Sequence, residues 1–268
     1  FLGVMDKVAM YAGDPASLIG FNIGTGEFGF VAGDLDGSGS VPALFATAMS
    51  TASAFDIWQI DVDWSTENAS INQIASIPVT PFDSDLCSAS REACIPQPDG
   101  GPALEAITDR LMHRLQLRDF GSYKTMVTAH TVDVGNGRAG IRWYEMRNLN
   151  DGNGWFVYQQ GTYAPDSDHR WIGSIAMDGR GYIALGFSVS SEETFPSIRY
   201  TGRSPGDELG QLTFFEEEIV EGSGTQTGDA SLLYASYFGG TALQQARSIA
   251  VDGTGAFAVC RSIFSKIR

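Results

Sequence analysis

Short runs of apolar residues alternate with polar ones along most of the chain, and glycine, aspartate, asparagine or proline separates one run from the next. A period of two is typical of a half-buried β-strand. Helical periodicity is scarce, and its best candidate is residues 102–110, where alanine, leucine and glutamate favour one or two turns. Strands are expected at residues 28–33, 43–50, 55–64, 71–79, 111–120, 123–134, 139–148, 155–164, 171–178, 182–190, 197–203, 211–220, 231–238, 246–252 and 256–260. The pattern predicts an all-β protein: a sandwich, a barrel or a propeller.

An internal repeat favours the propeller. The segments SIAMDGRGYIAL at 174–185 and SIAVDGTGAFAV at 248–259 share one order: apolar strand, Asp-Gly-x-Gly turn, apolar strand. A four-stranded blade takes roughly 40–50 residues, which leaves room for five or six blades. We therefore predict a single β-propeller domain over residues 1–268, whose ring closure the sequence leaves open. The alternative is two unrelated hairpins with ordinary Asp-Gly turns.

Residues 231–259 resemble the seven-bladed β-propeller repeat abbreviated SBBP. That pattern runs Tyr-x-x-Tyr-Phe/Leu-Gly-Gly, a spacer, and Ile-Ala-Val-Asp-x-x-Gly. The matching residues are Tyr234, Tyr237, Phe238, Gly239, Gly240, Ile249, Ala250, Val251, Asp252 and Gly255. The resemblance implies a blade at 231–260 and a place among large secreted or surface proteins of bacteria.

Residues 1–228 resemble a second group, secreted bacterial propeller-like proteins of uncharacterised function. The resemblance rests on the segments at 109–148 and 158–203. It implies a secreted protein, extracellular or at the cell surface, with further propeller sequence before Phe1. We expect the chain to be a fragment or a natural fusion.

Two cysteines are expected to form a disulfide. Cys87 and Cys94 are seven residues apart in a Pro-, Ser- and Asp-rich loop at 81–104, and no histidine or third cysteine lies near them for zinc. A disulfide there would place the protein in an oxidising compartment. Cys260 is expected to be a strand residue.

The charge balance narrows the choice of partners. The chain has 17 basic and 32 acidic residues, for a net charge of −15. Such a surface repels nucleic acid and anionic membranes. No apolar run reaches the length of about 18 residues that a membrane-spanning helix needs. The expected partners are carbohydrate, another extracellular ligand, or a cation.

The loop Gly33–Ser40 is a candidate calcium site. Asp34, Asp36 and Ser38 alternate along it and could present hard oxygens to Ca²⁺. Phe45 stands where an EF-hand has its bidentate glutamate, so the loop is not an EF-hand. A plain Asp-Gly turn is the alternative.

Two clusters could bind a ligand. The first lies at the start of the predicted strand 171–178 and consists of Asp168, His169, Arg170 and Trp171. The arginine could supply hydrogen-bond donors in a fixed geometry, and the tryptophan could stack on a sugar ring. The alternative is a structural network in which Arg170 pairs with an acid and Trp171 packs between blades.

The second cluster spans two neighbouring predicted strands. His130 and Asp133 lie on one, and Arg142, Tyr144 and Glu145 lie on the next. Charged residues inside strands are costly to bury unless they are paired. They should therefore form ion pairs or line a central channel.

These clusters support two hypotheses about function. The first is a secreted binding or surface module that recognises carbohydrate or another extracellular ligand. The second is a glycoside hydrolase, which needs two carboxylates roughly 5–10 Å apart, with Asp133, Glu145 and Asp168 as candidates. The sequence lacks a nucleophile elbow, a Walker loop and an HExxH motif. Whether the protein is an enzyme is left open at this stage.

Overall fold

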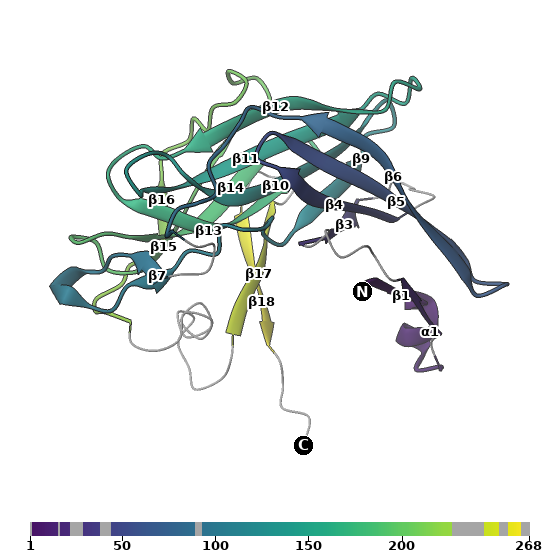
Figure 1. Ribbon diagram of the computed structural model, residues 1–268, viewed down its shortest axis with the longest axis horizontal. Coiled ribbons are helices and arrows are strands. Elements are labelled where there is room, and N and C mark those ends of the chain that lie inside the picture. Colours follow the sequence, from purple (N-terminus) through teal and green to yellow (C-terminus); the bar gives the residue numbers. More distant parts are fainter. Residues whose placement is uncertain are drawn as a thin grey trace.

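The computed structural model describes residues 2–15, 17–21, 29–37, 44–88, 93–226, 244–251 and 257–263. The protein is all-β, as predicted, and the described part contains several separate sheets, none of which closes on itself. Figure 1 shows the larger sheets layered together, with the hairpin of β17 (Gln244–Val251) and β18 (Phe257–Ile263) extending away from them and β1 (Leu2–Met5) lying apart beside α1 (Lys7–Ala12). Among the described residues, no helix is long and apolar enough to cross a membrane.

Most of the described chain forms three successive four-stranded units, which we call the first, second and third meander. Within each, every strand pairs antiparallel with the next strand in the sequence. The strands are β3 (Val31–Asp36), β4 (Leu44–Thr51), β5 (Ala54–Asp63) and β6 (Asn68–Pro78); β9 (Leu115–Asp119), β10 (Lys124–Asp133), β11 (Ala139–Asn148) and β12 (Trp155–Tyr163); β13 (His169–Met177), β14 (Ile183–Ser190), β15 (Ser197–Arg203) and β16 (Glu217–Val220). Strand β3 also pairs in parallel with β9, which joins the first two meanders.

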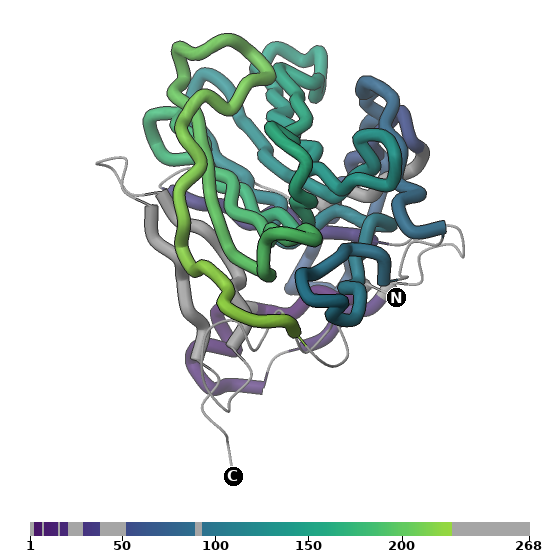
Figure 2. The backbone as a smooth tube through the Cα atoms, turned by 90° about the vertical axis from the view of Figure 1, so that its left-hand side faces the viewer, coloured from purple at the N-terminus to yellow at the C-terminus, as the bar shows by residue number. Residues whose placement is uncertain are grey.

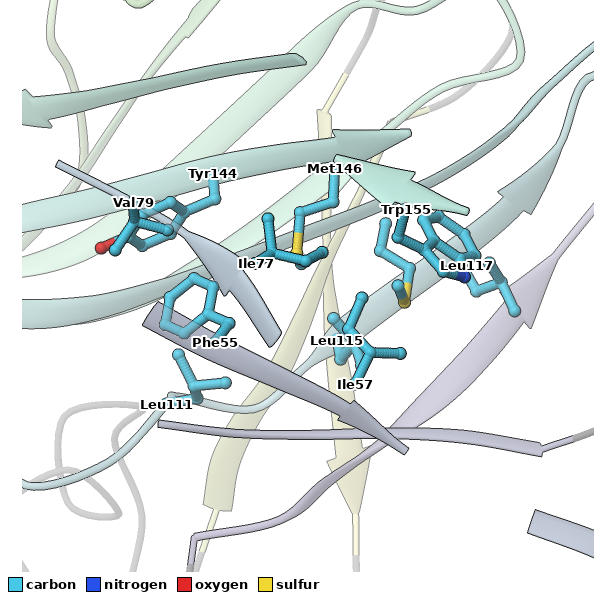
Figure 3. Packing of buried hydrophobic residues seen from close by; sticks show 11 residues of the cluster. Phe55, Ile57, Ile77, Val79, Leu111, Leu115, Leu117, Tyr144, Met146 and Trp155 are labelled. Carbon is cyan, nitrogen blue, oxygen red and sulfur yellow. The ribbon is translucent and has the colours of Figure 1, made fainter. Parts of the chain in front are cut away.

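The second meander lies between the other two because side chains alternate along its strands. On one side, Met126, Tyr144 and Met146 pack with Phe55 and other residues of the first meander. Figure 3 shows Tyr144 and Met146 beside Phe55 and Ile77. On the other side, Val127, Ala129, Ile141 and Trp143 pack with residues of β13 and β14. In Figure 2, the blue first meander and the green third meander lie on opposite sides of the view.

The two copies of the internal repeat form equivalent hairpins. Met177 pairs with Ile183 in the β13–β14 hairpin, and Val251 pairs with Phe257 in the hairpin of β17 (Gln244–Val251) and β18 (Phe257–Ile263). In both hairpins the first strand ends at an Asp-Gly dipeptide, and a register shift interrupts its earlier part. Cys260 lies in β18, as predicted. The predicted strand at 231–238 is outside the described residues.

The predicted helix at 102–110 is wrong. That segment contains β8 (Leu104–Glu105), which pairs with β7 (Ala93–Ile95) after a 3₁₀ turn at Pro98–Gly100. Leu104 is buried beside the disulfide loop, and this tertiary contact overrides a weak local helix propensity.

The helix of the described part is α1 (Lys7–Ala12), which lies between β1 (Leu2–Met5) and β2 (Leu18–Phe21). The Asp6 carboxylate caps its start by accepting from the amide N–H of Val8, and Gly13 ends it with a left-handed φ of 75°.

The predicted disulfide is confirmed. Cys87 and Cys94 are bonded, with their Cα atoms 5.5 Å apart. Residues of this loop pack against Ala139 of β11 and Trp171 of β13; they are Leu86, Cys87 and Ile95. The disulfide loop is thereby fixed on the ends of the second and third meanders.

We expect the loss of this bond to destabilise the protein. In the variant Cys87→Ser/Cys94→Ser, the unfolded chain regains the freedom of a short loop, and the free energy of unfolding should fall by about 2–3 kcal/mol. Denaturant unfolding measures the difference. A reducing agent should lower the stability of the parent protein and leave the variant unchanged; equal sensitivity of the two proteins would contradict the prediction.

Candidate functional site

Four connections meet at one end of the second and third meanders, and we call this end the loop face. They are residues 79–88 with 93–114, then 134–138, 164–168 and 191–196. Hydrogen bonds tie them together: the Asp133 amide donates to the Asp83 carbonyl at 2.9 Å, and the Thr194 hydroxyl donates to the Asp168 carboxylate at 2.9 Å. The Arg138 guanidinium donates to the Asp166 carbonyl.

Two open hollows on the loop face are lined by described residues. The larger, of about 540 Å³, is called the Arg142 hollow, and its lining includes Phe82, Asp83, Asp133, Arg138, Arg142 and Thr162. The smaller, of about 320 Å³, is lined by Pro96, Asp168, His169 and the acidic pair Glu192 and Glu193, among others. The larger hollow combines donors, acceptors and an aromatic ring.

Arg142 reaches the larger hollow from β11 and is only 9% exposed. Its guanidinium donates to the Thr162 hydroxyl at 3.0 Å, to the Gln160 side-chain carbonyl at 2.6 Å and to the Thr80 backbone carbonyl at 3.4 Å. All three partners are uncharged. The Nε–H group has no partner among the described residues.

His130 and Tyr144 lie fully buried near Arg142. The His130 Nε2 atom and the Tyr144 hydroxyl are 3.0 Å apart, and the two rings stack in parallel. Burial, reinforced by the positive charge of Arg142, lowers the pKa of His130 to about 3. Burial also raises the pKa of Tyr144. Both rings are therefore neutral at physiological pH, and neither is exposed to a ligand.

Asp133 lines the larger hollow but also holds its own turn together. Its carboxylate accepts from the amide groups of Gly135 at 2.6 Å and Gly137 at 3.2 Å. The Asp83 carboxylate accepts in the same way from the Asp85 amide at 2.9 Å. Each carboxylate retains lone pairs for a ligand, because an ionised carboxylate accepts about four hydrogen bonds.

Glu145 lies away from the loop face. It is 1% exposed, pairs with Arg147 at 2.6 Å and accepts from the Gln159 amide. Its register partner is Val127, whereas Asp133 pairs with Ala139. Six residues of strand separate the two positions, which is about 20 Å. That separation exceeds the roughly 5–10 Å between the paired carboxylates of glycosidases, so Asp133 and Glu145 do not form such a pair.

Asp168 and His169 lie on the loop face with Asp133. The Nδ1 atom of His169 accepts from the Ala139 amide at 3.2 Å, and burial lowers the pKa of this histidine. The charges of Asp168 and Asp133 both act on the ring and oppose that shift. Of the three candidate carboxylates, Asp133 and Asp168 are therefore the two that the structure brings to one face.

Arg170 and Trp171 are occupied by structural contacts. Arg170 is 1% exposed and forms ion pairs with Asp166 at 2.7 Å and Glu216 at 2.8 Å. Trp171 is 4% exposed and packs against the disulfide loop. In this arrangement neither side chain is open to a ligand.

The candidate calcium loop is only partly described. Asp34 and Asp36 both form ion pairs with Arg114, the first at 2.8 Å, and Gln116 also donates to Asp36 at 2.6 Å. A calcium ion would have to compete with Arg114 for these oxygens. Ser38 lies outside the described residues. In the described ranges, Asp34 and Asp36 included, no group of three or more His, Cys, Asp or Glu side chains could hold a metal. Calcium binding stays a prediction.

The site also includes residues that sequence reasoning missed. Phe82, Arg138 and Thr162 come from three segments that are distant in the sequence, and the fold brings them to one hollow. None belongs to a local motif. For Arg138 the sequence did contain a local signal. Asn136-Gly137 predicts a tight turn between two strands, and such a turn places the residue that follows it, Arg138, at the edge of the sheet.

Comparison with known proteins gives no further guide to the site. No family model matches the chain, no curated protein matches it, and no solved structure matches it. The chemistry of the loop face is therefore derived from its geometry.

The low pKa of His130 predicts a pH dependence of stability. An unfolded chain protonates this histidine near its ordinary pKa of 6.5, while the folded chain keeps it neutral down to about pH 3. The free energy of unfolding should therefore fall as the pH drops from 6.5 toward 3, with this group contributing at most about 1.4 kcal/mol per pH unit. The variant His130→Gln should show a shallower fall in urea unfolding at pH 7, 5.5 and 4.5. Parallel curves for parent and variant would contradict the assignment.

Proposed function

We propose that the protein is a secreted β-propeller module that binds carbohydrate at its loop face. The propeller is supported by the three meanders, which share one strand order and stack in sequence as consecutive blades do. The parallel pairing of β3 with β9 gives further support, because the first strands of neighbouring blades run side by side around a common axis. The β17–β18 hairpin then belongs to a later blade of one domain of five or six blades.

The Arg142 hollow carries the proposal of a ligand site. Carbohydrate hydroxyl groups donate and accept hydrogen bonds, and this hollow offers carboxylate acceptors on Asp83 and Asp133 beside guanidinium donors on Arg138 and Arg142. The Phe82 ring supplies an apolar surface for the face of a sugar. A few convergent polar groups in a preformed hollow are typical of a binding site.

The proposed location rests on the disulfide. Disulfides persist in oxidising environments and are rare in the cytosol. The bonded pair Cys87–Cys94 therefore supports a secreted or cell-surface protein.

A glycoside hydrolase is the second candidate. It is favoured by one observation: Asp133 and Asp168 share the loop face, and the charges of both act on His169. Two carboxylates near one histidine could serve as acid and base.

Glycan binding by the purified chain tests the main proposal. We expect Asp83→Asn to weaken binding about tenfold, because it replaces a charged acceptor with a neutral one. Asp151→Asn is the matched control: Asp151 also accepts from the amide two residues on, at 3.0 Å, but lies in the β11–β12 connection. A glycan array read with the parent and both variants measures the effect. Equal losses in both variants, or no bound glycan, would refute the proposed site.

Turnover assays separate the second candidate from the first. If the protein is a hydrolase, Asp133→Asn and Asp168→Asn should each abolish release of a chromogenic leaving group, while Glu145→Gln should act only through stability. Binding without turnover by the parent protein would eliminate the hydrolase.

A further inference from the structure

We propose that the Arg142 hollow selects carbohydrates that carry a carboxylate group, that is, uronic acids, over neutral sugars. This inference rests on the proposed carbohydrate-binding function and names the ligand class of the same site. The carboxylate would accept from Arg138 at the rim and lie beside the positive charge of Arg142.

The first support is that the buried charge of Arg142 lacks a counter-ion. A guanidinium removed from water is costly unless an anion compensates it. Two other buried arginines of the described part follow this rule: Arg114 pairs with Asp34 and Asp36, and Arg170 pairs with Asp166 and Glu216. Within the described residues no carboxylate lies within 4 Å of Arg142, which donates to neutral oxygens and lies 5.4 Å from the centroid of the Tyr144 ring.

Arg203 is the nearest comparison and differs in two respects. It too is buried and bonds only to backbone carbonyls, those of Ser204 and Asp207. However, the negative charges of Glu145 and Asp207 act on it, and it is not part of the lining of either hollow. Arg142 instead is part of the lining of an open hollow. The missing counter-ion can therefore come from a ligand.

The two carboxylates in the hollow form no ion pair with Arg142, whose hydrogen bonds run to Thr80, Gln160 and Thr162. Asp133 is engaged with the amides of its turn, and Asp83 with the amide of Asp85. Arg138 adds a second guanidinium to the lining, and its hydrogen bond runs to the backbone carbonyl of Asp166 rather than to a carboxylate. One ligand anion can thus approach two guanidinium groups.

The same hollow disfavours densely charged ligands. The net charge of −15 repels polyanions. A ligand with negative charge on every side would also place some of that charge against Asp83 and Asp133, which repel it. A uronic acid has one carboxylate for the arginines and neutral hydroxyl groups for the aspartates. This distribution of charge matches the hollow better than a phosphate or sulfate cluster does.

The inference is tested with two pairs of sugars. In each pair, one member carries carboxylate groups and the other is its neutral counterpart. Isothermal titration compares digalacturonate with α-1,4-galactobiose, and cellobiouronate with cellobiose, on the full chain. We expect the acidic member of at least one pair to bind ten times more tightly or better, and added salt to reduce the preference. Arg138→Gln should reduce it at least threefold, whereas the control Arg180→Gln, in the β13–β14 turn at the opposite strand ends, should leave it unchanged.

Arg142 itself is tested by Arg142→Gln, which removes the positive charge and keeps an amide donor. We expect this variant to lose the preference while retaining the circular dichroism spectrum of the parent. If it does not fold, the Arg138→Gln comparison still decides.

The outcomes separate the inference from the proposed function. Equal binding of acidic and neutral sugars would overturn the charge selection and leave carbohydrate binding intact. If none of the four sugars binds and the glycan array shows no bound glycan, both the charge selection and the proposed carbohydrate binding are overturned. Tighter binding of triglycine, through its terminal carboxylate, than of either uronate would assign the hollow to peptides and overturn the inference.

Discussion

The second meander has to bury both of its faces, and the rest of the structure depends on this constraint. Along β10 and β11, one set of alternate residues packs against the first meander, and the other set packs against the third. A slip of one residue in either strand would exchange the two sets and expose polar groups to both cores. The register of these two strands therefore positions three layers at once.

Polar residues on such strands must find their partners inside the protein. Glu145 does so through Arg147 and Gln159, and His130 does so through Tyr144 while remaining neutral. These contacts account for much of the charged and aromatic character of the middle of the chain. They also remove these side chains from contact with solvent, so they serve the architecture rather than a ligand.

Exposed chemistry is consequently left to the strand ends. The disulfide loop covers the starts of β11 and β13, and hydrogen bonds connect it to the neighbouring turns. Arg142 is the exception among the buried residues of β11, because it is part of the lining of an open hollow and its hydrogen bonds run only to neutral partners. A rigid two-sided core beneath adaptable loops is a common way to hold a binding site in shape.

Local patterning determined the strands, the disulfide and the repeated hairpin. Alternation in segments such as 123–134 and 139–148 depends on neighbouring residues alone, and two cysteines seven apart can meet without the help of a fold. The sequence could not determine which charged residues would share a surface. Asp133 and Glu145 looked equally suited to a pair, yet register places them at distant points of one sheet. The hollow joins Phe82, Arg138 and Thr162 because sheets stack and loops close over them, and that depends on contacts between residues far apart in the chain.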